Sequence, residues 1–130
     1  MAVKRALERA EGDMRRAEEF LREEGAAVVS KKAARETKTG IIVSYVHACR
    51  IGVLVEIKCE TDFVSRNPDF QTFARDLAMQ VAASAPEDVG GLLESPYIKD
   101  PGRTVREIVQ EAIQKFGENI EVGRFSRLEL

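Results

Sequence analysis

Apolar and polar residues alternate with a period of two from Gly40 onward, which is typical of β-strands. A first run covers residues 41–47. After a short link, a second run places these residues on one face: Ile51, Val53, Val55, Ile57 and Cys59. The pattern predicts an antiparallel hairpin whose second strand is buried and ends just before residues 61–64.

A period close to 3.6 residues follows the hairpin and predicts two helices. Asn67 and Pro68 are typical of a helix start, with Asn as the N-cap and Pro at the first helical position. Thr104 and Glu107 form a capping box that opens the second helix. Between the helices, residues 86–103 contain Gly and Pro among apolar residues, so a docked loop is expected there.

Helical periodicity also dominates the first 40 residues. One short helix is expected before Gly12, and a second is expected to stop at Gly25, because glycine often follows the last turn of a helix. We accordingly divide this part of the chain into a partial helical module (residues 1–25) and a basic helical linker (residues 26–40).

A last strand is predicted over residues 120–130. The order of helices, hairpin, two helices and strand favours an α+β fold, in which helices cover a three-stranded antiparallel sheet. This α+β core spans residues 41–130 and is preceded by the short helical N-terminal module.

Composition and charge narrow the functional classes. The 130 residues have room for one domain, and 20 basic against 22 acidic residues give a net charge of -2, without an overall signal for nucleic acid or a membrane surface. No apolar run approaches the roughly 20 residues that a membrane span needs, and the start lacks the apolar core of a signal peptide. A cytoplasmic protein is expected.

A basic cluster in the linker leaves two interpretations open. It contacts RNA or an acidic protein surface, or it is a solvated linker, since four cations interleaved with Ala and Glu36 make a weak electrostatic signal. The cluster consists of Lys31, Lys32, Arg35 and Lys38.

No sequence feature predicts an enzyme. Glycine-rich nucleotide motifs and nucleophile elbows do not occur, and no His and carboxylate cluster has metal-ligand spacing, so neither cofactor nor metal is expected. His47 and Cys49 lie two residues apart without a third orienting group, which argues against a catalytic dyad. Cys59 continues the apolar alternation and is expected to be a small buried side chain.

The tetrad Thr61-Asp62-Phe63-Val64 lies between the buried strand and the proline-started helix. One interpretation is structural: Thr61 or Asp62 caps a helical turn while Phe63 and Val64 fold back into the core. The other is functional: the aromatic side chain projects outward and contacts a partner.

The stretch RIGVLVEIKCETDFVSRNPDFQTFARDLAMQVAASAP closely resembles the signature of the bacterial translation elongation factor Ts family. Two further stretches are similar to parts of that family. AVKRALERAEGDMRRAEEFLREEGAA looks like the later two helices of its N-terminal UBA-like module, and GENIEVGRFSRLEL looks like its closing strand. The resemblance covers nearly the whole chain and implies that residues 41–130 form a dimerisation-type domain of this family.

The resemblance implies guanine-nucleotide exchange on elongation factor Tu, the GTPase that delivers aminoacyl-tRNA. It implies that Asp62 and Phe63, with Thr61 and Val64, enter the partner's GTPase domain beside its magnesium and phosphate site. Secondary contacts are expected from two residues, Arg5 in the N-terminal module and Gln80, a position where the family often has His.

Departures from the family pattern leave alternatives open. The chain begins where the family's first helix would already have ended, so residues 1–25 are expected to be loosely held or packed on a partner. A shortened relative that binds elongation factor Tu with little exchange, or an RNA-binding accessory protein, remains an alternative. One sheet unit is present where long members carry two, and an uncovered sheet edge favours pairing, as in a homodimer.

Overall fold

The computed structural model describes residues 14–130, and the chain divides into two compact units, residues 1–34 and 35–130. The first unit contains helix α2 (Met14–Lys32). The prediction that this helix stops at Gly25 is wrong. An interior glycine costs only about 1 kcal/mol relative to alanine, and the alanines that follow favour continuation to Lys31 and Lys32, whose charges suit a helix C-terminus. Arg5 and the helix predicted before Gly12 lie outside the described residues.

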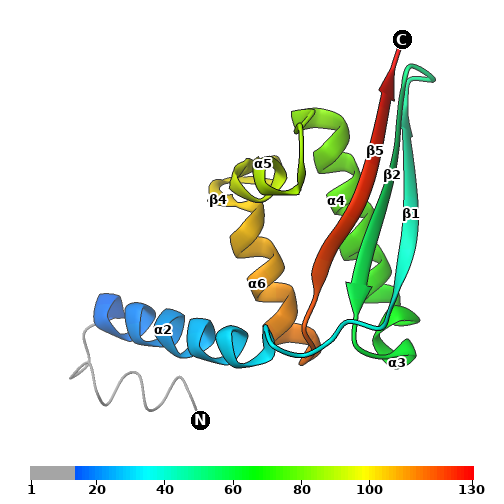
Figure 1. The fold of residues 1–130 in the computed structure, drawn as a ribbon. Coiled ribbons are helices and arrows are strands. Elements are labelled where there is room, and N and C mark those ends of the chain that lie inside the picture. Colours follow the sequence, from blue (N-terminus) through cyan, green and yellow to red (C-terminus); the bar gives the residue numbers. More distant parts are fainter. Residues whose placement is uncertain (1–13) are drawn as a thin grey trace. The chain divides into compact units, whose positions relative to one another are not determined.

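The second unit is built on a three-stranded antiparallel sheet. Its strands are β1 (Thr39–His47), β2 (Ile51–Cys59) and β5 (Glu121–Glu129), and their order in the sheet is β1-β2-β5. The central strand is therefore β2, which pairs with a neighbour on each side (Figure 1). The predicted α+β class and the three-stranded antiparallel sheet are confirmed.

The turn between β1 and β2 fixes the register of the hairpin. Ala48 and Cys49 both have positive φ angles, 52° and 58°, and the backbone N–H of Arg50 donates to the carbonyl of His47 at 3.0 Å. Pairing then runs from His47 opposite Ile51 to the last pair of the ladder. That last pair joins the two ends of the hairpin, Thr39 and Cys59.

Helices pack on one face of this sheet, with α4 running along it (Figure 1). Both predicted helix starts are confirmed: the Asn67 side chain accepts from the Asp69 N–H, and Thr104 and Glu107 form the capping box. The helices are α3 (Asp62–Ser65), α4 (Pro68–Ser84), α5 (Val89–Glu94) and α6 (Val105–Phe116).

The loop predicted over residues 86–103 is wrong in detail. Asp88 accepts a hydrogen bond from the Gly91 N–H and opens α5, and a small hairpin of β3 (Pro96–Tyr97) and β4 (Asp100–Thr104) follows. The side-chain cap offsets the low helix propensity of two adjacent glycines.

The two faces of the sheet differ in burial. The inner face, with Val55, Ile57 and Cys59 fully buried, packs against α4, in which Phe70 and Leu77 are also fully buried. The other side leaves four apolar side chains exposed: Ile42, Val46, Leu54 and Leu128.

Candidate functional site

Helix α3 is a single turn between the end of β2 and the start of α4. Thr61 is its N-cap, with extended backbone angles (φ -133°, ψ 157°), but the Thr61 side chain makes no capping bond. Two backbone bonds close the turn, from Ser65 N–H to Thr61 O at 3.2 Å and from Arg66 N–H to Asp62 O at 3.0 Å. The turn is called the tip below and comprises residues 61–65.

Adjacent side chains of the tip face opposite ways. Phe63 is 84% exposed, whereas Val64 is only 4% exposed and belongs to the core. Ser65 is also buried and donates its hydroxyl to the carbonyl of Asp62 at 3.1 Å. Val64 therefore folds back into the core as the structural interpretation expected, whereas its expectations of a side-chain cap from Thr61 and of a buried Phe63 are wrong. Phe63 projects outward, and its contact with a partner stays a prediction.

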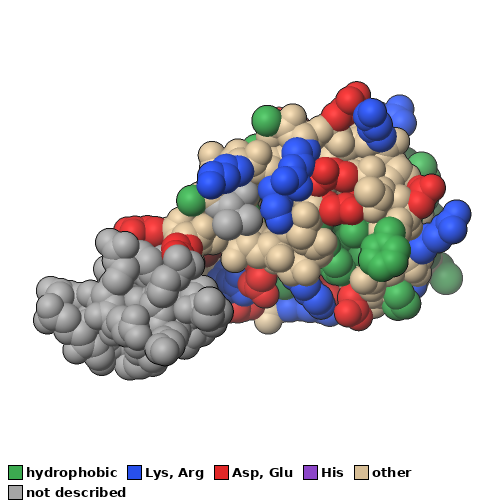
Figure 2. Space-filling model, turned by 90° about the horizontal axis from the view of Figure 1, so that it is seen from below, with side chains coloured by type: hydrophobic (Ala, Val, Ile, Leu, Met, Phe, Trp, Pro, Cys, Tyr) green, Lys and Arg blue, Asp and Glu red, His purple; other side chains and the backbone are tan. Residues whose placement is uncertain are grey.

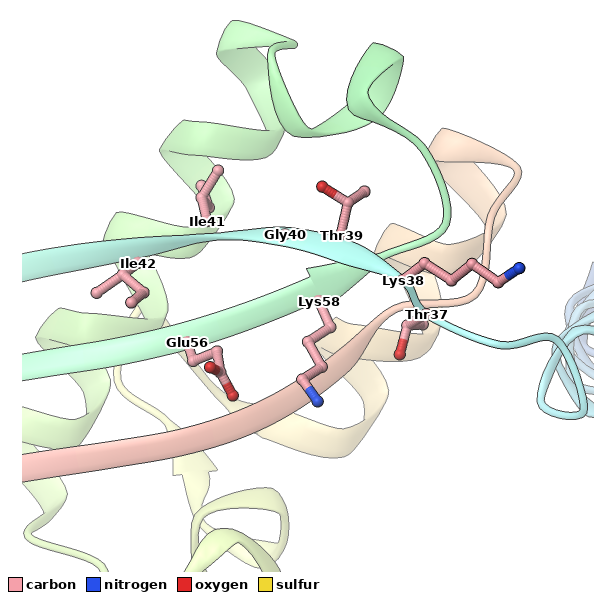
Figure 3. Close-up of a pocket in the computed structure, with 8 residues that line it drawn as sticks. All are labelled: Thr37, Lys38, Thr39, Gly40, Ile41, Ile42, Glu56 and Lys58. Atoms are coloured by element: carbon pink, nitrogen blue, oxygen red, sulfur yellow. The ribbon is translucent and has the colours of Figure 1, made fainter.

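The Asp62 carboxylate is exposed and held from the neighbouring strand. The hydroxyl of Thr39 donates to Asp62 Oδ1 at 2.9 Å. Figure 3 shows Thr39 and Ile41 pointing to one side of the sheet, while Glu56 and Lys58 point to the other. No local pattern in the sequence marks Thr39 as a contact of the tip, because 23 residues separate the two side chains.

The hydroxyl of Thr61 donates to the carboxylate of Glu118, at 2.6 Å. Glu118 lies between α6 and β5, far from Thr61 in sequence. A shallow hollow of about 570 Å³ lies beside the tip, lined by Asp62, Phe63, Arg66, Asn67 and Pro68. Seen from the end of the sheet that carries α3, hydrophobic side chains gather among acidic and basic ones (Figure 2).

Gln80 has a different environment from the tip. It is 0% exposed, its amide nitrogen donates to the carbonyl of Pro96 at 3.0 Å, and its amide oxygen accepts from the Ile98 N–H at 2.9 Å. Gln80 therefore ties α4 to the β3–β4 hairpin and offers no exposed surface to a partner. The partner contact expected of Gln80 stays a prediction.

Another cavity, of about 510 Å³, lies beside Lys38 and Lys58 (Figure 3). The carboxylate there, Glu56, is paired with Arg124 at 3.1 Å, and hydrogen bonds from the guanidinium and from the backbone N–H of Arg124 lower the pKa of Glu56. Among residues 14–130 no group of His, Cys, Asp and Glu is arranged to hold a metal ion.

The two cysteines have different environments, one buried and one exposed. Cys59 is fully buried, as expected, and burial together with the nearby charge of Glu118 raises the pKa of its thiol to about 11. A thiol with that pKa stays protonated at neutral pH and is a poor nucleophile. Cys49 is exposed in the β1–β2 turn, and His47 Nδ1 lies 2.9 Å from the hydroxyl of Tyr45.

Within residues 14–130, no helix has the length and apolar character to cross a membrane.

Comparison with known proteins identifies the family. The sequence model for "Elongation factor TS" matches residues 60–130, which include the tip. Elongation factor Ts of Thermodesulfovibrio yellowstonii is 37% identical over 174 aligned positions, covering 100% of this chain and 87% of the relative. The proteins of the same name from Carboxydothermus hydrogenoformans and Rubrobacter xylanophilus are each 40% identical over 176 positions, covering 100% of this chain and 81% and 90% of the relatives.

These alignments are longer than the chain of 130 residues, so the relatives carry residues inside the aligned region that this chain lacks. Identity at this level over the whole chain nevertheless shows common descent and a common fold. The chain belongs to the elongation factor Ts family.

Proposed function

We propose that this chain promotes GDP release from elongation factor Tu in the cytoplasm by placing Asp62 and Phe63 beside the magnesium and phosphate site of that GTPase. The observation that carries the proposal is the exposure of Phe63, 84%, on a turn whose next residue is buried. A lone exposed apolar side chain is ordinary. An aromatic one presented by an ordered turn is suited to insertion into a partner.

Phe63 acts as the wedge in this mechanism. Burial of an aromatic side chain in a protein pocket is worth roughly 1.5–3 kcal/mol, and this free energy is available only if the partner opens a space for the ring. Displacement of the partner's phosphate-binding loop provides such a space. The binding of Phe63 is thereby coupled to weaker binding of GDP.

Asp62 supplies a negative charge to the same place. A magnesium ion bridging GDP oxygens is the largest local charge in a GTPase site, so disturbing its ligands removes much of the binding free energy of GDP. The Asp62 carboxylate is exposed, next to Phe63, and held by Thr39. It competes for the magnesium ion or accepts hydrogen bonds released when the loop moves.

Contacts with the core and within the turn hold the tip in place. Val64 anchors it in the core, and the Ser65 hydroxyl bonds the carbonyl of Asp62. Thermodynamic linkage requires the reverse effect as well: nucleotide binding to elongation factor Tu weakens its binding to this chain. The chain therefore catalyses exchange without making or breaking a covalent bond.

A second candidate function is binding to elongation factor Tu with little exchange. The observation that favours it is the length of the alignments, because the relatives contain internal residues that this chain lacks. If those residues supply contacts with the partner, this chain binds elongation factor Tu more weakly, or its tip inserts less far into the nucleotide site.

Release of fluorescent GDP from elongation factor Tu, followed by stopped flow, tests the proposal. The wild-type chain should accelerate release, and Phe63→Ala should reduce the acceleration by about 10- to 150-fold, the factor that corresponds to the lost burial. Asp62→Ala should also reduce it. Ile98→Ala is the matched control, since Ile98 is a 43% exposed apolar residue on the β3–β4 hairpin rather than the tip.

Binding of the wild-type chain without acceleration would support the second candidate. Full acceleration by Phe63→Ala would refute the role of the tip.

A further inference from the structure

We propose that Glu118 is a positioning residue for the tip: its carboxylate clamps the backbone at Glu60 and Thr61 and thereby sets the direction in which Asp62 and Phe63 project. This inference rests on the proposed function for its effect on exchange. The clamp itself can be tested without that function.

Three hydrogen bonds converge on the Glu118 carboxylate. Oε1 accepts from the backbone N–H groups of Glu60 and Thr61, each at 3.0 Å, and Oε2 accepts from the Thr61 hydroxyl at 2.6 Å. Bonds to an ionised acceptor are about twice as strong as bonds between neutral groups. Glu118 thus holds the residue directly before Asp62 by both its backbone and its side chain.

A reciprocal bond joins the same two segments in the opposite direction. The Glu60 carboxylate accepts from the backbone N–H of Asn119 at 2.6 Å and lies 3.8 Å from the guanidinium of Arg35. Asn119 is 3% exposed, and its side-chain amide donates to the carbonyl of Arg35 at 2.8 Å. Each segment therefore provides a carboxylate that bonds the backbone of the other.

The origin of Glu118 explains why it can reach the tip. Helix α6 ends at Phe116, and Gly117 caps it with a positive φ of 74°, a left-handed conformation that glycine adopts without strain. The chain reverses there, and Glu118 follows directly, before β5 begins. The length and direction of α6 therefore determine where the carboxylate lies.

The clamp also accounts for the unusual start of α3. Thr61 occupies the N-cap position, but its hydroxyl bonds Glu118 instead of an N–H group of the turn. The orientation of this turn relative to β2 is consequently set from outside the turn. Without the Glu118 carboxylate, Thr61 is free to rotate and to cap α3 itself, which reorients Asp62 and Phe63.

The test compares the wild-type chain with Glu118→Ala and Glu118→Gln in the GDP-release assay, with Glu111→Ala as the control. Glu111 is an exposed carboxylate on α6 that pairs with Arg103, away from the tip. At a saturating concentration of this chain, Glu118→Ala should lower the rate of GDP release by about 10- to 100-fold, because Asp62 and Phe63 are then displaced from their working positions. The concentration for half-saturation should change less.

Glu118→Gln should recover part of the rate, because an amide oxygen can still accept from both backbone N–H groups. Amide hydrogen exchange gives a readout that does not depend on elongation factor Tu. The amides of Glu60 and Thr61 should exchange faster in Glu118→Ala than in Glu111→Ala.

Unchanged protection of these two amides in Glu118→Ala overturns the clamp. If Phe63→Ala loses activity while Glu118→Ala keeps the full rate, the positioning role is wrong and the proposed function stands. If Phe63→Ala keeps the full rate, the proposed function is wrong, and amide exchange alone decides the clamp. Should Glu118→Ala not fold, the same comparisons are made with Glu118→Gln, whose rate and protection should lie below those of the wild type.

Discussion

Phe63 and Val64 are consecutive residues of one helical turn, yet the Phe63 side chain is 84% exposed and the Val64 side chain is 4% exposed. The two residues therefore have separate roles, one in the stability of the turn and one in contact with a partner. Val64 holds the turn on the core, and Phe63 is available to a partner. Substitution of Val64 should therefore mainly lower stability, and substitution of Phe63 should mainly lower exchange activity.

Val64→Ala is expected to lower the free energy of unfolding by roughly 2 kcal/mol, since it removes two buried methyl groups and leaves space in the core. Phe63→Ala should change it by less than about 0.5 kcal/mol, as is usual for exposed positions. Urea denaturation of the two variants measures the difference. An equal loss of stability in both would mean that the tip is held in some other way.

Gln80→Leu should destabilise the chain by at least about 2 kcal/mol. The substitution leaves the Ile98 N–H and the Pro96 carbonyl without their partner, and each buried polar group without a bond costs about 1–3 kcal/mol. Gln114→Leu, at an exposed position of α6, is the control and should be nearly neutral. Exchange activity per folded molecule should be unchanged in Gln80→Leu, and a selective loss of activity would restore the partner contact expected from the sequence.

The thiol of Cys59 should make stability fall at alkaline pH. Its pKa is raised from 9.0 to about 11, first by burial and then by the charge of Glu118. Between these two values the unfolded chain loses the proton that the folded chain keeps, so this contribution is complete below pH 9 and is lost as pH rises towards 11. Denaturation below pH 9 and near pH 11 measures the loss of unfolding free energy between the two pH values. This loss should be smaller for Cys59→Ala than for Cys49→Ala, which alters only the exposed thiol.

The edge strands β1 and β5 each have only one neighbour in the sheet, and an unpaired edge favours pairing with another chain. A homodimer therefore stays a prediction, and sedimentation equilibrium should show a dimer. A monomeric chain at high concentration would contradict the pairing.

Local sequence signals predicted the elements that depend on neighbouring residues. The apolar alternation ending at Cys59 identified the central strand, and Asn67 and Thr104 identified two helix starts, because capping uses atoms only a few residues apart. The helix end predicted at Gly25 is wrong, since a single glycine is tolerated inside a helix at modest cost. The loop predicted where α5 lies is wrong because Asp88 caps that helix and offsets its two glycines.

The sequence predicted the position of the candidate site in the chain, but not the orientation of its side chains or their distant contacts. The tetrad could be located, but the side on which Phe63 lies depends on which neighbour packs into the core, and periodicity cannot decide that for a four-residue turn. The contacts of Thr39 and Glu118 with the tip join residues 23 and 57 positions apart. Such bonds are set by the register of the sheet and the end of α6, which only the folded structure reveals.

The β1–β2 turn has a consequence for how this chain tolerates insertions and deletions. With Ala48 and Cys49 both in left-handed conformations, the turn sets the pairing that brings Thr39 opposite Cys59, at the far end of both strands. A length change that slips this register by one residue would move Thr39 to the opposite side of the sheet, away from Asp62. Length changes engineered into this turn should therefore be tolerated only where a local bulge absorbs them, although the turn lies at the other end of the hairpin from Thr39.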